Sequence, residues 1–158
     1  MAKILLGFMG AGKSTIARAL SADFLDMDEL IVHKIGMSIQ EYFAKYGEPA
    51  FREIEAEVLS ECIQQDVVLS TGGGVVLSPQ NRDLLARNSQ NIYLKADFET
   101  LFRRIEQDQE NHRPLYLTKS KADLQEIFEQ RQALYEAVAT QTIDVVGKTP
   151  QEIIEEIQ

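Results

Sequence analysis

Residues Gly7 to Ser14 spell G-x-x-x-x-G-K-S, and this octapeptide constrains the fold more than any other feature of the chain. It follows a short apolar run, residues 3–6, and precedes an amphipathic segment that opens at Ile16. A strand, a glycine-rich loop and a helix, in that order, form a phosphate-binding P-loop. The alternative, a glycine-rich turn that binds nothing, does not explain eight matching residues with the correct flanks. The chain is therefore predicted to bind a nucleoside triphosphate.

Each residue type in this motif has a role at a triphosphate. The glycines let successive backbone N–H groups point at one anion, and the helix that follows adds the positive end of its dipole. Lys13 adds a full charge, and Ser14 is placed to ligate a Mg²⁺ ion between the outer phosphates. The motif thus predicts a magnesium–nucleotide site.

The composition limits the partners of the chain. Its 158 residues suit a single domain, 1–158, and its net charge of −9 would repel nucleic acid. The single cysteine, Cys62, excludes an intrachain disulfide and suits a reducing compartment. The apolar run from Ile4 to Met9 is too short for a signal peptide, and no stretch approaches the roughly 20 apolar residues of a membrane span. We expect a cytoplasmic protein with no nucleic acid or membrane partner.

Two aspartates follow the first predicted helix. If residues 24–28 form a strand, its period of two places the carboxylates of Asp26 and Asp28 on one face. In the alternative interpretation they mark a solvated strand end, with Asp28 capping a helix from Glu29. The pair taken alone favours this alternative, but its position soon after a Mg²⁺-binding loop weakens it, because like charges held together usually have a cation close by. The next apolar strand ends in Ser70, where many P-loop enzymes have a metal-positioning aspartate, so Asp26 is the better metal candidate.

Two further patterns leave alternatives open. Arg52 and Glu55 lie three residues apart on a predicted helix, either as a surface ion pair or with Glu55 orienting Arg52 to grip a carboxylate or phosphate. Three consecutive glycines, Gly72 to Gly74, form either a flexible turn or a backbone that approaches a small ligand closely. The second interpretation is favoured, because three glycines together cost considerable backbone entropy.

Strands and helices alternate along the chain, which predicts a three-layer α/β/α fold around a five-stranded parallel sheet. The expected strands cover residues 3–7, 24–28, 66–70, 91–95 and 143–146. The expected helices cover 14–23, 29–35, 38–47, 79–88 and 97–106, with others from 48, through 124–135 and from 149. Ligands of such folds bind beyond the carboxyl ends of the strands. The P-loop, the aspartates and the glycines should therefore converge.

Together these elements resemble the shikimate kinase family over nearly the whole chain. The P-loop alone is widespread, and the combination of the other motifs is far more selective. These motifs are Asp26-Met27-Asp28, Phe51-Arg52-x-x-Glu55, Ser70-Thr71-Gly72-Gly73-Gly74, Arg113-Pro114-Leu115, and Arg131 in R-x-x-L-Y. The resemblance implies a fold like that of nucleoside monophosphate kinases, with substrate-binding helices at about 28–65 and a mobile lid at about 108–121. It also implies ATP-dependent phosphorylation of the 3-hydroxyl of shikimate, in chorismate and aromatic amino acid biosynthesis.

The resemblance further implies a role for each matching residue. Asp28 contacts the shikimate hydroxyls and acts as the base, with Lys13 and Arg113 completing the catalytic set. ATP is bound by Gly10, Ala11, Gly12, Lys13, Ser14, Thr15 and Arg113. Ser14 and Asp26 hold one Mg²⁺ per subunit, and a monomer is expected. Shikimate is bound by Asp28, Arg52, Gly72, Gly73, Gly74 and Arg131, the two arginines pairing with its carboxylate.

One position departs from the family pattern. Glu106 stands at the offset before the lid arginine where the family often has an arginine that stacks on adenine, and Arg104 is the nearest basic residue. Further adenine contacts are expected near Thr149 and Pro150.

Other functions compete with this interpretation. A gluconate or nucleoside kinase would share the P-loop, and gluconate also offers a carboxylate to arginines. A nucleotide-dependent switch of the GTPase type usually carries an [NT]-K-x-D motif, which the sequence lacks. A noncatalytic ATP-binding module would have no need of Asp28 or of two carboxylate-gripping arginines.

The P-loop assignment predicts the effect of Lys13→Ala. The substitution should lower kcat by about 10³-fold or more, because the ammonium group offsets charge that develops between the outer phosphates. Folding should survive, since the side chain reaches into a loop and not into a core. Steady-state kinetics and a melting curve test this, and an active Lys13→Ala enzyme would show that the P-loop assignment is wrong.

Overall fold

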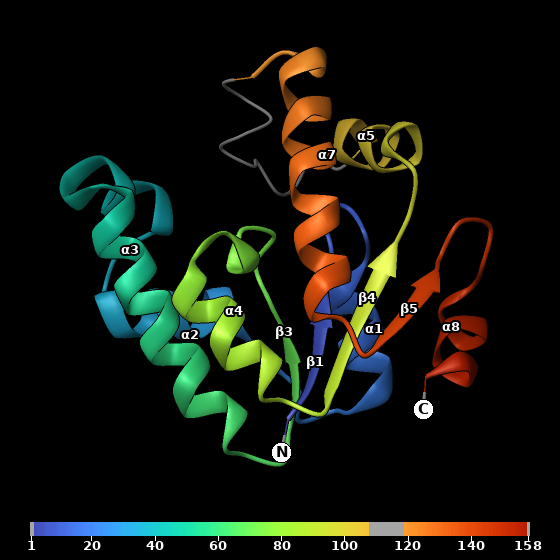
Figure 1. Ribbon diagram of the computed structural model, residues 1–158, viewed down its shortest axis with the longest axis horizontal. Helices are drawn as coiled ribbons and strands as arrows, with labels where there is room; N and C mark the ends of the chain where they lie inside the picture. The colour runs from blue at the N-terminus through green and yellow to red at the C-terminus, as the bar shows by residue number, and fades with distance from the viewer. Residues whose placement is uncertain (1, 108–118, 158) are drawn as a thin grey trace.

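A five-stranded parallel sheet forms the centre of the computed structural model, which describes residues 2–107 and 119–157 (Figure 1). The strands lie in the order β2-β3-β1-β4-β5, so the first strand of the chain is the central one. Their bounds are Lys3–Leu6 (β1), Leu25–Asp26 (β2), Val68–Ser70 (β3), Gln90–Lys95 (β4) and Gln141–Asp144 (β5). The predicted parallel sheet is therefore confirmed.

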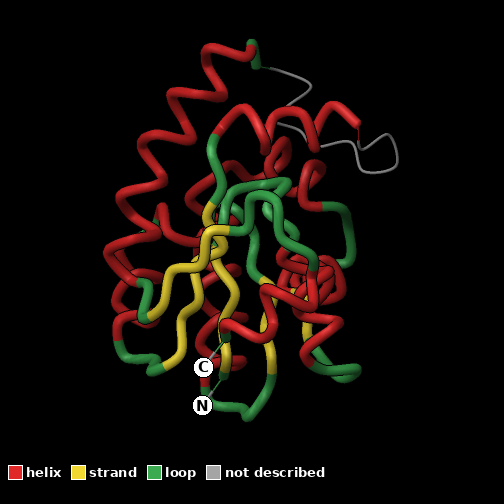
Figure 2. The backbone as a smooth tube through the Cα atoms, turned by 90° about the vertical axis from the view of Figure 1, so that its right-hand side faces the viewer, coloured by secondary structure: helices red, strands yellow, loops and turns green. Residues whose placement is uncertain are grey.

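Helices cover both faces of the sheet. Helices α3, α4 and α7 lie on the near face in Figure 1, and α1 and α8 pack together on the far face. Figure 2 shows the strands between these two layers, which confirms the three-layer architecture. The helices are Lys13–Leu20 (α1), Met27–Ile35 (α2), Ile39–Ile63 (α3), Pro79–Ala86 (α4), Phe98–Gln107 (α5), Lys121–Val138 (α7) and Pro150–Glu156 (α8), with a short 3-10 helix, η1, at Val75–Leu77. Within the described ranges, no helix is long and apolar enough to cross a bilayer.

Local sequence signals set the helix ends around the site. Gly36 ends α2 in the left-handed conformation, with φ at 72°. Ser38 begins α3, because its side chain accepts a hydrogen bond from the backbone N–H of Glu41 at 3.1 Å. Gly47 breaks the helical geometry inside α3 with φ at 84°. The two helices predicted on either side of Gly47 are therefore present as one kinked element.

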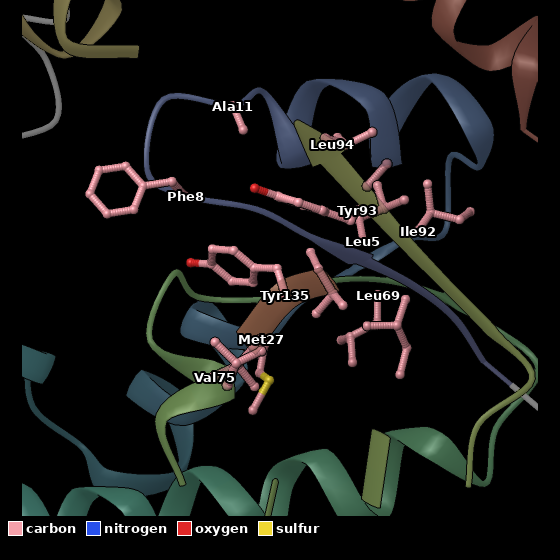
Figure 3. Close-up of a cluster of buried hydrophobic side chains, with 14 of the residues drawn as sticks. Leu5, Phe8, Ala11, Met27, Leu69, Val75, Ile92, Tyr93, Leu94 and Tyr135 are labelled. Atoms are coloured by element: carbon pink, nitrogen blue, oxygen red, sulfur yellow. The ribbon is translucent and has the colours of Figure 1, made fainter. Parts of the chain in front are cut away.

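The core is built on β1 and the side chains that face it. Ile4, Leu5 and Leu6 are fully buried. Figure 3 shows the rings of Tyr93 from β4 and Tyr135 from α7 close to each other, with centroids 5.1 Å apart. Burial of side chains of this size contributes about 1.5–3 kcal/mol each, so the core holds β1 and the loop that follows it in a fixed place.

Strand β5 and the segment after β3 are among the elements that differ from their predictions. Strand β5 covers residues 141–144 and not 143–146, because the Asp144 carboxylate accepts the backbone N–H of Val146 at 3.0 Å and turns the chain there. The 3-10 helix η1 was not predicted, since three apolar residues carry no periodicity that separates a short helix from a strand.

A buried asparagine fastens two helices to the sheet. Asn91, in β4, is fully buried, and its Nδ2 donates to the carbonyl oxygens of Leu85 at 2.7 Å and Val138 at 2.9 Å. These carbonyls lie at the ends of α4 and α7. Asn91 therefore ties both helices to the central sheet.

We expect Asn91→Ala to lower the free energy of unfolding by about 2–4 kcal/mol, because it removes two buried hydrogen bonds and a buried side chain. Urea denaturation measures this loss. Gln125→Ala, on the exposed face of α7, is the control and should change stability by less than about 0.5 kcal/mol. Equal losses in the two variants would contradict the role of Asn91.

Candidate active site

The P-loop joins β1 to α1, as the motif predicts. Gly10 and Gly12 both adopt left-handed backbone conformations, with φ at 86° and 92°. A Cβ on Gly10 would also lie 3.2 Å from the carbonyl oxygen of Leu101, so this position requires glycine for two reasons. No side chain of the described residues caps α1, which begins at Lys13. The first N–H groups of α1 are thus available to an anion.

Lys13 reaches back into this loop. Its Nζ donates to the carbonyl oxygens of Gly7 at 2.5 Å and Phe8 at 3.2 Å. The backbone of the loop thus fixes the ammonium group beside the N-terminus of α1, where an anion gains from both positive charges.

Oxygen groups from the first turn of α1 and from the ends of β2 and β3 meet next to Lys13. The hydroxyl of Ser14 donates to Oδ2 of Asp26 at 3.3 Å, and it lies 3.3 Å from the hydroxyl of Ser70. A carboxylate and a hydroxyl suit Mg²⁺, which binds oxygen ligands and usually keeps waters or phosphates in its other positions. Among the described residues no three His, Cys, Asp or Glu side chains gather at one point, so most ligands of an ion here would come from water and phosphate.

Asp26 also shapes the chain around it. Its Oδ1 accepts the backbone N–H groups of Asp28 at 3.0 Å and Glu29 at 3.4 Å, so Asp26 is the N-cap of α2. The predicted strand over residues 24–28 is present but shorter: β2 ends at Asp26, because this cap turns the chain into a helix. The argument that both carboxylates share a strand face is therefore wrong, and so is the alternative that Asp28 caps the helix.

Asp28 nevertheless lies beside the glycine loop, in the cavity that the P-loop lines. It lies in the first turn of α2, and both carboxylates line the same cavity as the P-loop. A Cβ on Gly72 would lie 3.0 Å from Oδ1 of Asp28. The glycine loop and this carboxylate are thus in close approach.

The Arg52–Glu55 pair is not a surface ion pair, because the side chain of Glu55 is only 3% exposed. Nη1 of Arg52 donates to Oε1 of Glu55 at 2.9 Å and to the carbonyl oxygen of Gly74 at 3.1 Å. Its Nε pairs with the exposed Glu48 at 3.4 Å. Burial raises the pKa of Glu55, while the Arg52 charge and hydrogen bond act against that shift. Glu55, which also lines the cavity, thus holds Arg52 in place.

Arg131 and Tyr135 meet the same loop from α7. Arg131 is 8% exposed and lies with its guanidinium carbon 5.9 Å from the centre of the Phe8 ring. Burial lowers the pKa of Arg131 and raises that of Tyr135. The Tyr135 hydroxyl donates to the carbonyl oxygen of Gly73. Sequence reasoning missed this role of Tyr135, although its spacing of four from Arg131 places the two on one helix face.

Space is tight at two of the three glycines, Gly72 and Gly74. Of the described glycines with positive φ, none belongs to Gly72–Gly74. A Cβ would meet Asp28 at Gly72, lie 3.6 Å from Arg131 Nη1 at Gly73, and come within 2.8 Å of Arg52 Nη2 at Gly74. The loop therefore approaches one charged side chain at each glycine. The predicted close approach of this backbone to a small ligand stays a prediction.

With the exception of Phe8 and Tyr135, the side chains described above and the glycine loop line one cavity of about 990 Å³. Its remaining walls include residues at the start of α3 that sequence reasoning missed, because no chemical motif marks them. They are Ser38, Ile39, Gln40, Phe43 and Glu48.

Glu106 and Arg104, the two residues of the departure from the family pattern, lie in different surroundings. Glu106 is exposed, and it is not among the residues that line the cavity. Arg104 does line it, and its Nη1 donates to the carbonyl oxygen of Gly10 at 3.2 Å. Thr149 caps α8 through Glu152 and does not reach this cavity. Arg113 and residues 108–118 of the expected lid lie outside the described residues.

The site joins a P-loop to an aspartate that caps α2, a second carboxylate and two arginines that line the cavity, all at one edge of a parallel sheet. This combination defines a P-loop kinase of small molecules. Comparisons with known proteins specify the family. The sequence model of shikimate kinase matches residues 9–158. The chain is 55% identical to the shikimate kinase of Streptococcus gordonii, over 100% of this chain and 99% of the relative. It is 48% identical to that of Enterococcus faecalis, over 98% and 94%.

Two solved structures of shikimate kinases have the same fold as this chain. Shikimate kinase from Acinetobacter baumannii in complex with shikimate has a TM-score of 0.88 at 33% identity, covering 98% of this chain and 89% of that one. The enzyme from Aquifex aeolicus has a TM-score of 0.82 at 32% identity, covering 99% and 93%. The chain belongs to the shikimate kinase family, whose reaction is the ATP-dependent phosphorylation of shikimate. This distinguishes it from gluconate kinases, nucleoside kinases and nucleotide switches.

The position of Asp28 predicts a selective catalytic defect. Asp28→Asn keeps size but removes charge and basicity, so kcat should fall by about 10²–10⁴-fold, with the ATP KM nearly unchanged. The melting temperature should stay equal or rise, because repulsion from Asp26 disappears.

Glu29→Gln is the matched control, since Glu29 is the next residue of the same helical turn and does not line the cavity. Its kcat should be that of the unaltered enzyme. Near-normal turnover by Asp28→Asn in steady-state kinetics would remove Asp28 from the catalytic residues.

Proposed function

We propose that the chain transfers the γ-phosphoryl group of ATP to the 3-hydroxyl of shikimate, with the two substrates bound side by side in the 990 Å³ cavity. The observation that carries this assignment is the continuous lining of one cavity by P-loop residues at one end and by Asp28, Arg52 and Arg131 at the other. Phosphoryl transfer requires alignment and charge neutralisation more than bond-making groups, and this lining supplies both.

The nucleotide half of the proposal places ATP on the P-loop. Backbone N–H groups of residues 10–15 and the start of α1 hold the phosphates, and Lys13 neutralises their outer charge. Ser14 and Asp26 would hold one Mg²⁺, which screens the phosphates when bound. Arg104, above Gly10, is the described cation that we assign to the far part of the nucleotide.

The substrate half places the anion of shikimate against two guanidinium groups. Arg52 and Arg131 pair with its carboxylate, and the glycines of residues 72–74 let the ring lie against backbone. Asp28 orients the attacking hydroxyl and accepts its proton as the bond to phosphorus forms. Arg131 is buried, and its Nε has no hydrogen-bond partner among the described residues, which lowers the stability of the folded protein. A carboxylate that binds beside Arg131 would offset this loss of stability.

The organisation of the chain is part of the same proposal. We assign residues 1–158 to one kinase domain, with the helices of about residues 28–65 binding substrate. We further propose a cytoplasmic monomer that acts on small molecules, not on nucleic acid or membranes. The net charge of −9 supports this assignment, since a polyanion would be repelled.

The direct test is ADP release by the purified chain with shikimate, gluconate and nucleosides offered in parallel. Release that depends on shikimate alone is expected, and release with gluconate or a nucleoside but not with shikimate would overturn the proposal.

Arg52→Lys tests the carboxylate contact. An ammonium group cannot form the two parallel hydrogen bonds of a guanidinium group, so the shikimate KM should rise about 10-fold or more while the ATP KM changes little. Arg103→Lys, on the exposed face of α5, is the matched control and should leave both constants unchanged. Equal damage to both constants in Arg52→Lys would indicate that the Arg52–Glu55 pair is only structural.

A further inference from the structure

Asn81 is a buried polar residue outside the cavity. It lies in the first turn of α4, and its side chain is fully buried. Its Nδ2 donates to Oε1 of Glu55 at 2.9 Å. The same carboxylate oxygen accepts Nη1 of Arg52, also at 2.9 Å, and that nitrogen donates onward to Gly74 at 3.1 Å. A continuous chain of hydrogen bonds therefore runs from α4 through α3 to the glycine loop.

The contact with Glu55 fixes which way the amide points. A carboxylate accepts hydrogen bonds and does not donate them, so the NH₂ group must face Glu55. The other amide atom, Oδ1, is then buried without a hydrogen-bond partner in the described part of the chain. An unpaired buried acceptor lowers stability, so packing alone would favour an apolar residue at this position. The value of Asn81 thus lies in the hydrogen bond that it gives to Glu55.

We propose that Asn81 is a positioning residue for the substrate carboxylate: it holds Glu55 in the orientation that aims Arg52 into the cavity. This inference rests on the proposed pairing of Arg52 with shikimate. Glu55 has one oxygen between two donors on different helices, so its carboxylate can neither rotate nor withdraw from Arg52 without breaking a buried hydrogen bond. Burial raises the pKa of Glu55, and the hydrogen bonds from Arg52 and Asn81 help to keep it charged against that effect and against the repulsion of Asp28.

The proposal predicts a particular kinetic pattern. Arg52 would contact the carboxylate equally in the ground state and the transition state, so a poorly aimed Arg52 raises KM and leaves kcat unchanged. Asn81→Ala should raise the shikimate KM by about tenfold, the effect of losing one hydrogen bond to a charged group. Its kcat and ATP KM should remain within about twofold of the unaltered values.

Asn88→Ala provides a matched control. Asn88 is also buried and also has an unpaired Oδ1, but its Nδ2 donates to the carbonyl oxygen of Ala2 at 2.9 Å, at the opposite end of β1. Asn88→Ala should lower the melting temperature and leave the shikimate KM unchanged. Asn81→Leu, which fills the space of the amide, keeps the test open if Asn81→Ala folds poorly, and the same rise in shikimate KM is expected.

A double-mutant cycle with Glu55→Gln shows whether Asn81 acts through Glu55. If it does, Asn81→Ala raises the shikimate KM much less in the Glu55→Gln background than alone. Additive effects would overturn the proposal, as would an unchanged shikimate KM in a folded Asn81 variant or an equal rise in Asn88→Ala.

Arg52→Lys shows whether a negative result contradicts the pairing of Arg52 with shikimate or only the role of Asn81. If Arg52→Lys leaves the shikimate KM unchanged, the pairing of Arg52 with the carboxylate is wrong, and the role of Asn81 is wrong with it. If Arg52→Lys raises the shikimate KM and the Asn81 variants do not, only the role of Asn81 is wrong.

Discussion

Strands β1 and β3 lie side by side and end at the same edge of the sheet, where a buried hydrogen bond joins the loop that follows β3 to β1. The Thr71 hydroxyl donates to the carbonyl oxygen of Leu5 at 2.7 Å. It holds the start of the glycine loop against the base of the P-loop. On the other side of β3, Asp26 pairs in register with Ser70. The parallel pairing of three short strands therefore brings the P-loop, Asp26 and the glycine loop together.

Electrostatics explains how so acidic a chain can bind two anions. The net charge is −9, yet Arg52 and Arg131 both line the cavity. Burial lowers the pKa of Arg131, and the charge of Arg52 lowers it further. Two partly desolvated cations held together destabilise the folded protein, and a bound carboxylate would relieve that cost. Preorganised sites of this kind give up stability for affinity.

Features that depend on neighbours along the chain could be predicted from the sequence. The P-loop, the stop at Gly36 and the cap at Ser38 are local, because each follows from a few residues and their backbone geometry. The convergence of the strand ends followed from the alternation of strands and helices. Asp26 was misread because a cap and a strand end use the same residue types, and only the turn into α2 distinguishes them.

Features that depend on distant segments could not be predicted. The spacing of Arg52 and Glu55 is the same for a surface pair and a buried one, and the hydrogen bond that Glu55 accepts from Asn81 comes from the distant helix α4. The position of Arg104 above Gly10 depends on how α5 packs against the P-loop, which an offset counted along the chain does not capture.

The contact between Gly74 and Arg52 also restricts how this sequence can evolve. Any side chain at position 74 would come within 2.8 Å of the guanidinium group, so a mutation there displaces Arg52 whatever its polarity. Replacing Arg52 first would free the space but surrender its hydrogen bond to Glu55. Neither single step keeps the arrangement intact, so the two positions are expected to change together or remain fixed in any lineage that keeps this chemistry.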